Sequence, residues 1–184
     1  MSMTTKRLTR LALLTAVALV LGYVESFIPI APGIPGVKLG LSNTVLLYAL
    51  YLMDTKSAVF LMFLKVVLSG LLYAGFSAML FSLGGGIFSI IMMLIVRALW
   101  REKISIIGVS VVGAVFHNVG QLAVAAFMVN TISLLTYLPV LLISAVVTGI
   151  LTGLIAKYVI KALDTLGISE KKPASAKKEE DSKK

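Results

Sequence analysis

Hydrophobic residues run through most of the chain in long, nearly uninterrupted stretches, and polar or charged residues gather at a few points between them. A helix needs about 20 apolar residues to cross a membrane. The pattern predicts six such helices, at residues 8–28, 37–53, 57–73, 78–99, 104–129 and 134–163. We therefore expect an all-α integral membrane protein with six transmembrane helices. The second and third are short enough that one of them could be re-entrant.

Composition supports the same class of protein. Of the 184 residues, 59% are hydrophobic and 14% are charged, and the mean hydropathy is +1.02. A soluble domain is nearer half apolar and a quarter charged, so the bilayer is the expected solvent. Cysteine is absent, which excludes disulfides and thiol catalysis. The single histidine argues against a zinc site built from protein ligands alone.

The lysines and arginines between the predicted spans are distributed unevenly. Six spans place both ends of the chain on one side, which then holds nine basic residues against one, Lys38, on the other. Basic residues favour the cytoplasmic side of a membrane. We therefore expect a protein of the bacterial cytoplasmic membrane with both termini in the cytoplasm. The nine residues are Lys6, Arg7, Arg10, Lys56, Arg97, Arg101, Lys103, Lys157 and Lys161.

Residues 25–43 interrupt the apolar pattern between the first two predicted helices. Their prolines and glycines exclude one continuous helix. The same stretch carries three polar side chains, Glu25, Lys38 and Asn43. One interpretation is an interfacial connector that caps two helices. The other is a structured lid or pocket wall from which these side chains point inward.

Two predicted spans carry polar groups that need a partner or a water-filled cavity inside a membrane. Lys65 lies in the middle of the third span, so either its long stem reaches the membrane surface or its ammonium faces a cavity. His117, Asn118 and Gln121 in the fifth span are three and four residues apart, and therefore share one broad helix face. They form either an interhelical hydrogen-bond clamp or part of a ligand site.

The depth of these residues favours a cavity. All seven candidates lie at or outside the predicted midplane, whereas scattered structural polar residues would not favour one side. The charged members sum to one positive charge, which suits a ligand with a carboxylate, a phosphate or an electron-rich ring. The candidate substrate-binding residues are Glu25, Lys38, Asn43, Lys65, His117, Asn118 and Gln121.

Small residues recur at helical spacing in three of the predicted helices. They are Gly84–Gly86 in the fourth, Gly149 and Gly153 in the sixth, and Ala12 and Ala16 in the first. Such stripes let helices approach one another closely. We expect each to serve packing inside the bundle in preference to docking of a partner.

The motifs of several catalytic classes are missing. There is no G-x-x-x-x-G-K-[ST] sequence, so ATP hydrolysis by a P-loop is not expected. No pair of carboxylates lies in or near a span, although a Mg²⁺-diphosphate generally needs clustered carboxylates. We expect no catalytic residue and no metal site, and at most an accessory role beside an enzyme.

The last part of the chain differs in composition from the rest. Residues 169–184 contain no large apolar side chain and many charges, so they cannot bury a core. We expect residues 1–168 to form the membrane domain and residues 169–184 to form a disordered cytoplasmic tail.

Four segments together resemble a known family. They are PGVKLGLSN at 35–43, Lys65 followed by Ser69-Gly70, FSLGGGIFS at 81–89 and HNVGQL at 117–122. Over about residues 8–163 the chain resembles the bacterial Gx transporter family, also described as heptaprenyl diphosphate synthase component I. That family is grouped with the substrate-binding S components of energy-coupling factor (ECF) transporters.

The resemblance implies an S-component-like bundle that captures a small vitamin-like or precursor-like molecule from the outer side. It also implies partners, namely an ECF coupling protein and its ATPases. S components dock to the coupling protein through an alanine-x-x-x-alanine motif on the first helix, which Ala12 and Ala16 match. This function requires no cofactor and no nucleic acid.

Relatives of the family also occur beside flavin-based extracellular electron-transfer and quinone-synthesis components. They imply an alternative, in which the chain is a membrane subunit of a quinone, isoprenoid or flavin-linked system. In that case the cavity binds a quinone or a flavin, or the chain anchors a partner protein.

Under the first interpretation each candidate has an expected role. Lys38 and Lys65 contact an anionic or electron-rich group of the ligand. Glu25 pairs with a lysine or with a cationic part of the ligand. Side chains that orient the ligand by hydrogen bonds are Asn43, His117, Asn118 and Gln121.

Overall fold

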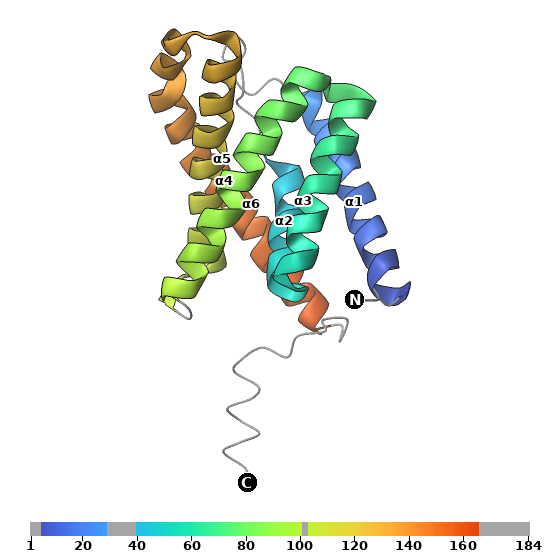
Figure 1. Ribbon diagram of the computed structural model, residues 1–184. Helices are drawn as coiled ribbons and strands as arrows, with labels where there is room; N and C mark the ends of the chain where they lie inside the picture. The colour runs from blue at the N-terminus through green and yellow to red at the C-terminus, as the bar shows by residue number, and fades with distance from the viewer. Residues whose placement is uncertain (1–4, 29–39, 101–102, 166–184) are drawn as a thin grey trace.

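The computed structural model describes residues 5–28, 40–100 and 103–165. In these ranges the chain forms a bundle of helices that run alternately up and down (Figure 1). Their order is α1 (Thr5–Ser26), α2 (Leu41–Leu52), α3 (Thr55–Ser69), the π-turn η1 (Gly70–Ala74), α4 (Phe76–Trp100), α5 (Ile106–Val129), the 3₁₀ helix η3 (Ile132–Tyr137) and α6 (Leu138–Thr165).

The expected fold class is confirmed. Within the described ranges every regular element is helical, and five helical segments are long and apolar enough to cross a membrane. The sixth, α2, is apolar but has only 12 residues. The start of α1 and the end of α6 lie at the same end of the bundle (Figure 1). The protein is therefore a helical membrane protein whose described residues form five long helical segments and one short helix.

Most predicted boundaries agree with the structure to within a few residues, and two differ for a physical reason. The third predicted helix ends earlier as an α-helix, because the chain passes into η1 and then reaches Gly75 with φ 86°, which suits glycine. The sixth begins as η3, and Pro139 lies in the first turn of α6, where no backbone donor is needed. Residues 37–39, Lys38 among them, and the expected tail at 169–184 lie outside the described residues.

The short helix α2 lies in the centre of the bundle. At about 1.5 Å per residue it is about 18 Å long, well below the ~30 Å thickness of a membrane core. It packs against α1, α3 and α6. Most of its apolar side chains are buried, whereas Tyr48 and Tyr51 are half-buried. The buried ones are Val45, Leu46, Leu47, Ala49, Leu50 and Leu52.

Glycines bring the long helices together. A Cβ atom at Gly153 of α6 would lie 2.7 Å from the Cα of Ile107 on α5, and one at Gly149 would lie 2.7 Å from the Cα of Val111. On α4, a Cβ at Gly84 would meet Val124 and the carbonyl of Gly120 on α5. Both helix pairs therefore need glycine at these contacts, and internal packing is confirmed for these two stripes.

For Ala12 and Ala16 the packing interpretation is wrong. Both side chains are exposed on α1. The buried face of this helix carries Leu11 and Thr15, each one residue before an alanine, and also Ala18. Helical periodicity explains the result, because residues one position apart point in directions about 100° apart. Docking of a partner on the two alanines stays a prediction.

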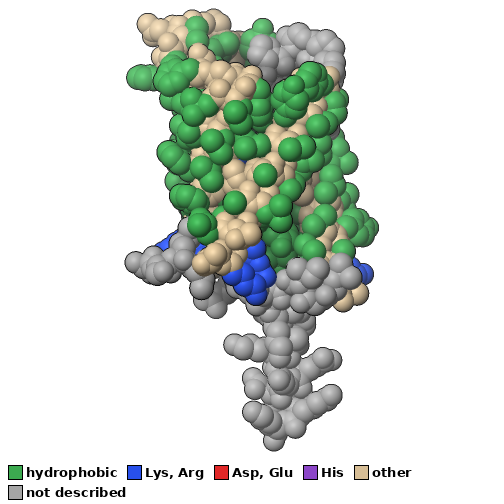
Figure 2. All heavy atoms as spheres, turned by 90° about the vertical axis from the view of Figure 1, so that its right-hand side faces the viewer, with side chains coloured by type: hydrophobic (Ala, Val, Ile, Leu, Met, Phe, Trp, Pro, Cys, Tyr) green, Lys and Arg blue, Asp and Glu red, His purple; other side chains and the backbone are tan. Residues whose placement is uncertain are grey.

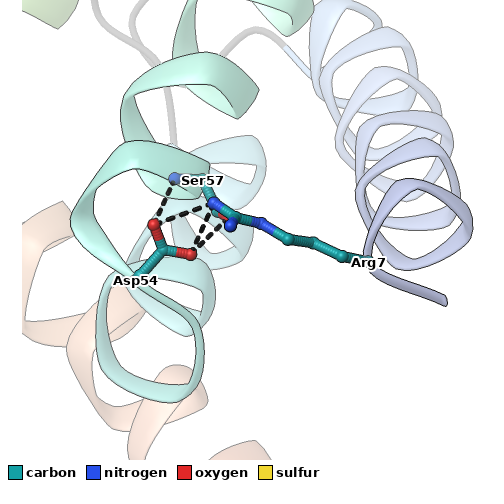
Figure 3. Close-up of polar contacts among 3 residues, drawn as sticks. All are labelled: Arg7, Asp54 and Ser57. Carbon is teal, nitrogen blue, oxygen red and sulfur yellow. Dashed lines mark hydrogen bonds and ion pairs between the residues drawn. The ribbon is translucent and has the colours of Figure 1, made fainter. Parts of the chain in front are cut away.

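Charged side chains mark one end of the bundle, which we call the basic end. In the view of Figure 2, hydrophobic side chains cover the flank and Lys and Arg side chains gather near this end. Here Arg7 of α1 binds Asp54, with Nη2 2.8 Å from Oδ2, and its Nε donates to the Oγ of Ser57 at 3.0 Å (Figure 3). Asp54 also caps α3 by accepting from the N–H of Ser57.

Candidate functional site

The half of the bundle away from the basic end contains a cavity of about 240 Å³, the polar cavity. All six α-helices contribute to its wall. Six of the seven candidate residues line it, although they come from four different helices, whereas Lys38 lies outside the described residues. The six are Glu25, Asn43, Lys65, His117, Asn118 and Gln121.

The start of α2 forms one side of the polar cavity. Gly40 precedes the helix with φ 76°, a conformation that favours glycine. The carboxylate of Glu25, which is 5% exposed, accepts hydrogen bonds from the backbone N–H groups of Gly40 at 2.5 Å and Leu41 at 3.0 Å. A carboxylate at a helix N-terminus is stabilised by the orphan donors and the helix dipole. Glu25 therefore caps α2, which agrees with the interpretation of residues 25–43 as a connector that caps helices, although the sequence did not single out Glu25 for this role.

Lys65 enters the same site from α3. Its side chain is in the bundle, with the residue 8% exposed, and its Nζ donates to Asn43 Oδ1 at 2.7 Å and to Ser42 Oγ at 3.1 Å. Both acceptors lie in the first turn of α2. The ammonium is thus directed toward the cavity wall, and the alternative in which its stem reaches the membrane surface is wrong. Lys65 and Glu25 together hold the beginning of α2 from two sides.

The polar residues of α5 divide between the two roles considered for them. Asn118 donates from Nδ2 to the carbonyl of Leu141 on α6 at 2.9 Å, so it is an interhelical clamp as well as a cavity residue. His117 packs beside Gly85 of α4, where a Cβ atom would lie 3.0 Å from two ring atoms. Among the described residues, none forms a hydrogen bond with the Gln121 amide, although it lines the cavity.

Hydroxyl groups complete the wall, and sequence reasoning missed them. Ser110 and Thr152 hydrogen-bond to each other at 2.9 Å across α5 and α6, and both are buried. A signal exists for Ser110 only, because Ser110, His117 and Gln121 repeat at helical spacing on one face of α5. Other hydroxyl residues of the wall are Ser26, Ser42, Ser69, Ser82, Ser89 and Thr148.

Tyr73 reaches the cavity from the π-turn η1. Its hydroxyl lies 3.4 Å from the carbonyl of Leu19 on α1, and a Cβ atom at Gly22 would lie 2.6 Å from it. Gly22 therefore leaves room for the phenol against α1. Single π-turns inside helices often occur at functional sites, but an apolar run gives no indication of one, so this residue was also missed.

A second cavity, of about 380 Å³, adjoins the first and is largely apolar. We call it the apolar cavity. It lies between α4, α5, η3 and the first turn of α6, and its wall includes Phe81, Leu122, Ala125, Leu134 and Leu141. Four residues line both cavities, namely Ala78, Ser82, Asn118 and Gln121.

Among the described residues, no group of three His, Cys, Asp or Glu side chains lies close enough to hold a metal ion. The two carboxylates whose contacts are described above are both engaged, Glu25 at the start of α2 and Asp54 at the start of α3. The site therefore offers hydrogen bonds, one ammonium and an imidazole, which are groups for binding a molecule.

Residues 14–159 match the model of a protein family described as heptaprenyl diphosphate synthase component I. The chain belongs to this family. The match extends from α1 through most of α6 and agrees with the resemblance found in the sequence. The description names one component of a synthase, in agreement with a non-catalytic or accessory subunit. No curated protein and no solved structure matches the chain.

Proposed function

We propose that this membrane protein captures a small organic molecule in its polar cavity, in the manner of a transporter S component. The observation that carries the proposal is the convergence of Glu25, Asn43, Lys65, His117, Asn118 and Gln121 on one cavity. Ionisable and amide groups inside a membrane domain are costly unless they serve a binding site or pair with one another. Four helices contribute such groups to the same space.

The proposal includes an orientation. Basic residues favour the cytoplasm, so the basic end faces inward and both termini are cytoplasmic in the bacterial inner membrane. The polar cavity then lies in the outer half of the bundle. A molecule enters it from outside, and uptake depends on an ECF coupling protein with ATPases, for which Ala12 and Ala16 present an exposed surface on α1.

The side chains divide the work of binding. Lys65 supplies a positive charge next to the hydroxyl of Ser42 and the amide of Asn43, and so suits an anionic or electron-rich group. His117 and Gln121 offer hydrogen bonds from the opposite wall. Glu25 acts indirectly, because its bonds to Gly40 and Leu41 hold α2 where this arrangement requires it.

The family description suggests a second role, that of an accessory membrane subunit of a prenyl diphosphate synthase. The volume of the polar cavity limits this role. About 240 Å³ holds roughly eight groups the size of a water molecule at ~30 Å³ each, whereas a heptaprenyl chain contains seven five-carbon units. In such a system, or in a quinone- or flavin-linked one, the subunit would therefore hold only part of that molecule or anchor a partner.

The experiment that tests the proposal is native mass spectrometry of the purified protein, in search of a retained small molecule. We expect a discrete bound mass in the wild type that is lost in Lys65→Met. The control is Lys56→Met, since Lys56 is exposed in the first turn of α3 and lines neither cavity. Retention of the same mass in Lys65→Met, or no bound mass in any folded form, would contradict binding at this site. Flavin or quinone absorbance of the bound species would favour the redox alternative.

A further inference from the structure

The apolar cavity is not used by the function proposed so far. It is at least as large as the polar cavity and lies beside it, between α4, α5 and η3. Taken alone, the polar cavity is smaller than the range of about 300–1,000 Å³ typical of small-molecule sites. The two cavities together fall within that range.

The two cavities share part of their walls, and the shared part is partly polar. Ala78 and Ser82, one turn apart on α4, line both spaces, and so do Asn118 and Gln121 on α5. The side chains that α4 contributes to the boundary are small. The amide of Asn118 is held by the carbonyl of Leu141. The half-buried Gln121 amide lines both cavities and has no hydrogen bond to any described residue, so it is available to a ligand.

We propose that the captured molecule is an amphiphile whose polar head lies in the polar cavity and whose apolar arm lies in the apolar cavity. This inference rests on the proposed function, because it assumes that the polar cavity binds a ligand. The arm passes between Ser82 and Gln121, and a polar atom at its root bonds the Gln121 amide. At about 380 Å³, the apolar cavity alone lies within the size range of small-molecule sites.

A membrane lipid chain fits the same observations less well. Lipid tails are as apolar as leucine, so transfer of a chain from the bilayer into this cavity gains no hydrophobic free energy. A bare chain would also leave Gln121 and Ser82 without a polar partner at the boundary. A molecule with its own polar group at that point fills both cavities and also gives Gln121 and Ser82 a hydrogen-bond partner.

The absence of cysteine from the chain permits a direct test. Ser82→Cys places one thiol on the wall common to both cavities. The protein in lipid nanodiscs is equilibrated with equal amounts of hexyl disulfide and hydroxyethyl disulfide under a weak reductant, and intact mass gives the ratio of the two adducts. Ala123→Cys, on the exposed face of α5, measures how far lipid partitioning alone favours the hexyl group.

We expect a several-fold higher ratio of hexyl to hydroxyethyl adduct at Ser82→Cys than at Ala123→Cys. Adding Ala125→Phe, which fills the apolar cavity, should lower the ratio to that of Ala123→Cys, whereas adding Ala123→Phe should leave it unchanged. Equal ratios at the two cysteines would overturn the inference, as would a ratio that Ala125→Phe does not lower. Because this test does not involve Lys65, its failure leaves the loss of a bound mass in Lys65→Met as a separate result.

Discussion

Near the basic end, α5 and α6 approach so closely that Gly153 leaves no room for a Cβ atom beside Ile107. Farther along, the same two helices carry His117, Gln121 and Thr148 around an open space. One half of the bundle is thus filled by apolar contacts and small residues, and the other half is hollow and polar. The two halves share their long helices, so the difference has another origin.

That origin is α2. Its 12 residues fill the centre of the half next to the basic end and begin only at Leu41, preceded by the left-handed Gly40. Opposite charges hold its two ends, a carboxylate at the N-terminus and a guanidinium at the C-terminus, which is the arrangement that the helix dipole favours. Glu25 accepts from the first N–H groups, and Arg97 donates to the carbonyl of Leu50 at 2.8 Å. On the side of Gly40 that faces away from the basic end, none of the described residues forms a helix in the centre of the bundle, and the polar cavity lies there.

We call the half next to the basic end the packed half, and its stability should be most sensitive to a substitution at Gly153. A leucine there would collide with the backbone of Ile107 and separate α5 from α6. Since overpacking commonly costs 1–3 kcal/mol and a backbone clash costs more, we expect Gly153→Leu to lower the free energy of unfolding by more than about 3 kcal/mol. Thermal unfolding in detergent measures the effect. Ala123→Leu, on the exposed face of α5, is the control and should have little effect; equal stability of the two variants would contradict close packing here.

The two halves meet at the start of α2, and Glu25 is the residue whose substitution should disturb this point most. Glu25→Ala would leave two N–H groups at the start of α2 without their acceptor, and a buried donor left unsatisfied costs about 1–3 kcal/mol. We expect a loss of about 2 kcal/mol in thermal unfolding together with loss of the bound mass. Glu25→Gln keeps one acceptor and should lie between Glu25→Ala and the wild type. A fully stable Glu25→Ala protein would show that this cap does not hold α2.

The other end of α2 offers a smaller effect. Arg97 donates to Leu50, and its guanidinium lies 4.5 Å from the centroid of the Tyr51 ring. Loss of one charged hydrogen bond and one cation–π contact in Arg97→Met should cost about 1.5 kcal/mol. Because this contact lies in the packed half, retention of the bound mass should be affected less than by Glu25→Ala. The reverse order would contradict the division between the two halves.

The smallest effect is expected at the Arg7–Asp54 contact. Burial by itself raises the pKa of Asp54, but hydrogen bonds from Ser57 and the charge of Arg7 outweigh it, so the pKa lies below its ordinary value. A lowered carboxyl pKa stabilises the fold above the pKa of the unfolded chain, and this contribution is lost as pH falls through the folded value. We expect Asp54→Asn to cost less than about 1 kcal/mol at pH 7, since the pair is exposed.

The pH dependence separates this contact from a general loss of stability. The difference in melting temperature between Asp54→Asn and wild type should shrink as pH falls below the ordinary carboxyl range. A difference that is the same at neutral and acidic pH would show that the charge of Asp54 contributes nothing.

The apolar runs were sufficient to predict the helical class and most helix ends. Lys65, His117 and Gln121 could be assigned to one site because polar groups within membrane-spanning helices are costly unless they pair with one another or face a common cavity. A cap within residues 25–43 was one of two interpretations, but its assignment to Glu25 could not be predicted, because Gly40 and Leu41 come next to its carboxylate only in the folded chain. Ser110 and Thr152 were missed because a hydroxyl in a helix can bond its own backbone, so its presence alone indicates nothing.

Thiol labelling from outside tests most directly whether α2 begins partway across the membrane and leaves a cavity that is open to the exterior. Ser42→Cys and Ala49→Cys lie seven residues, or about two turns, apart on α2. Ser42 lines the polar cavity, and Ala49 is fully buried in the packed half. A membrane-impermeant methanethiosulfonate added to intact cells should modify Ser42→Cys and leave Ala49→Cys unmodified. Equal modification of the two, or modification of Ser42→Cys only from the cytoplasmic side, would contradict the account.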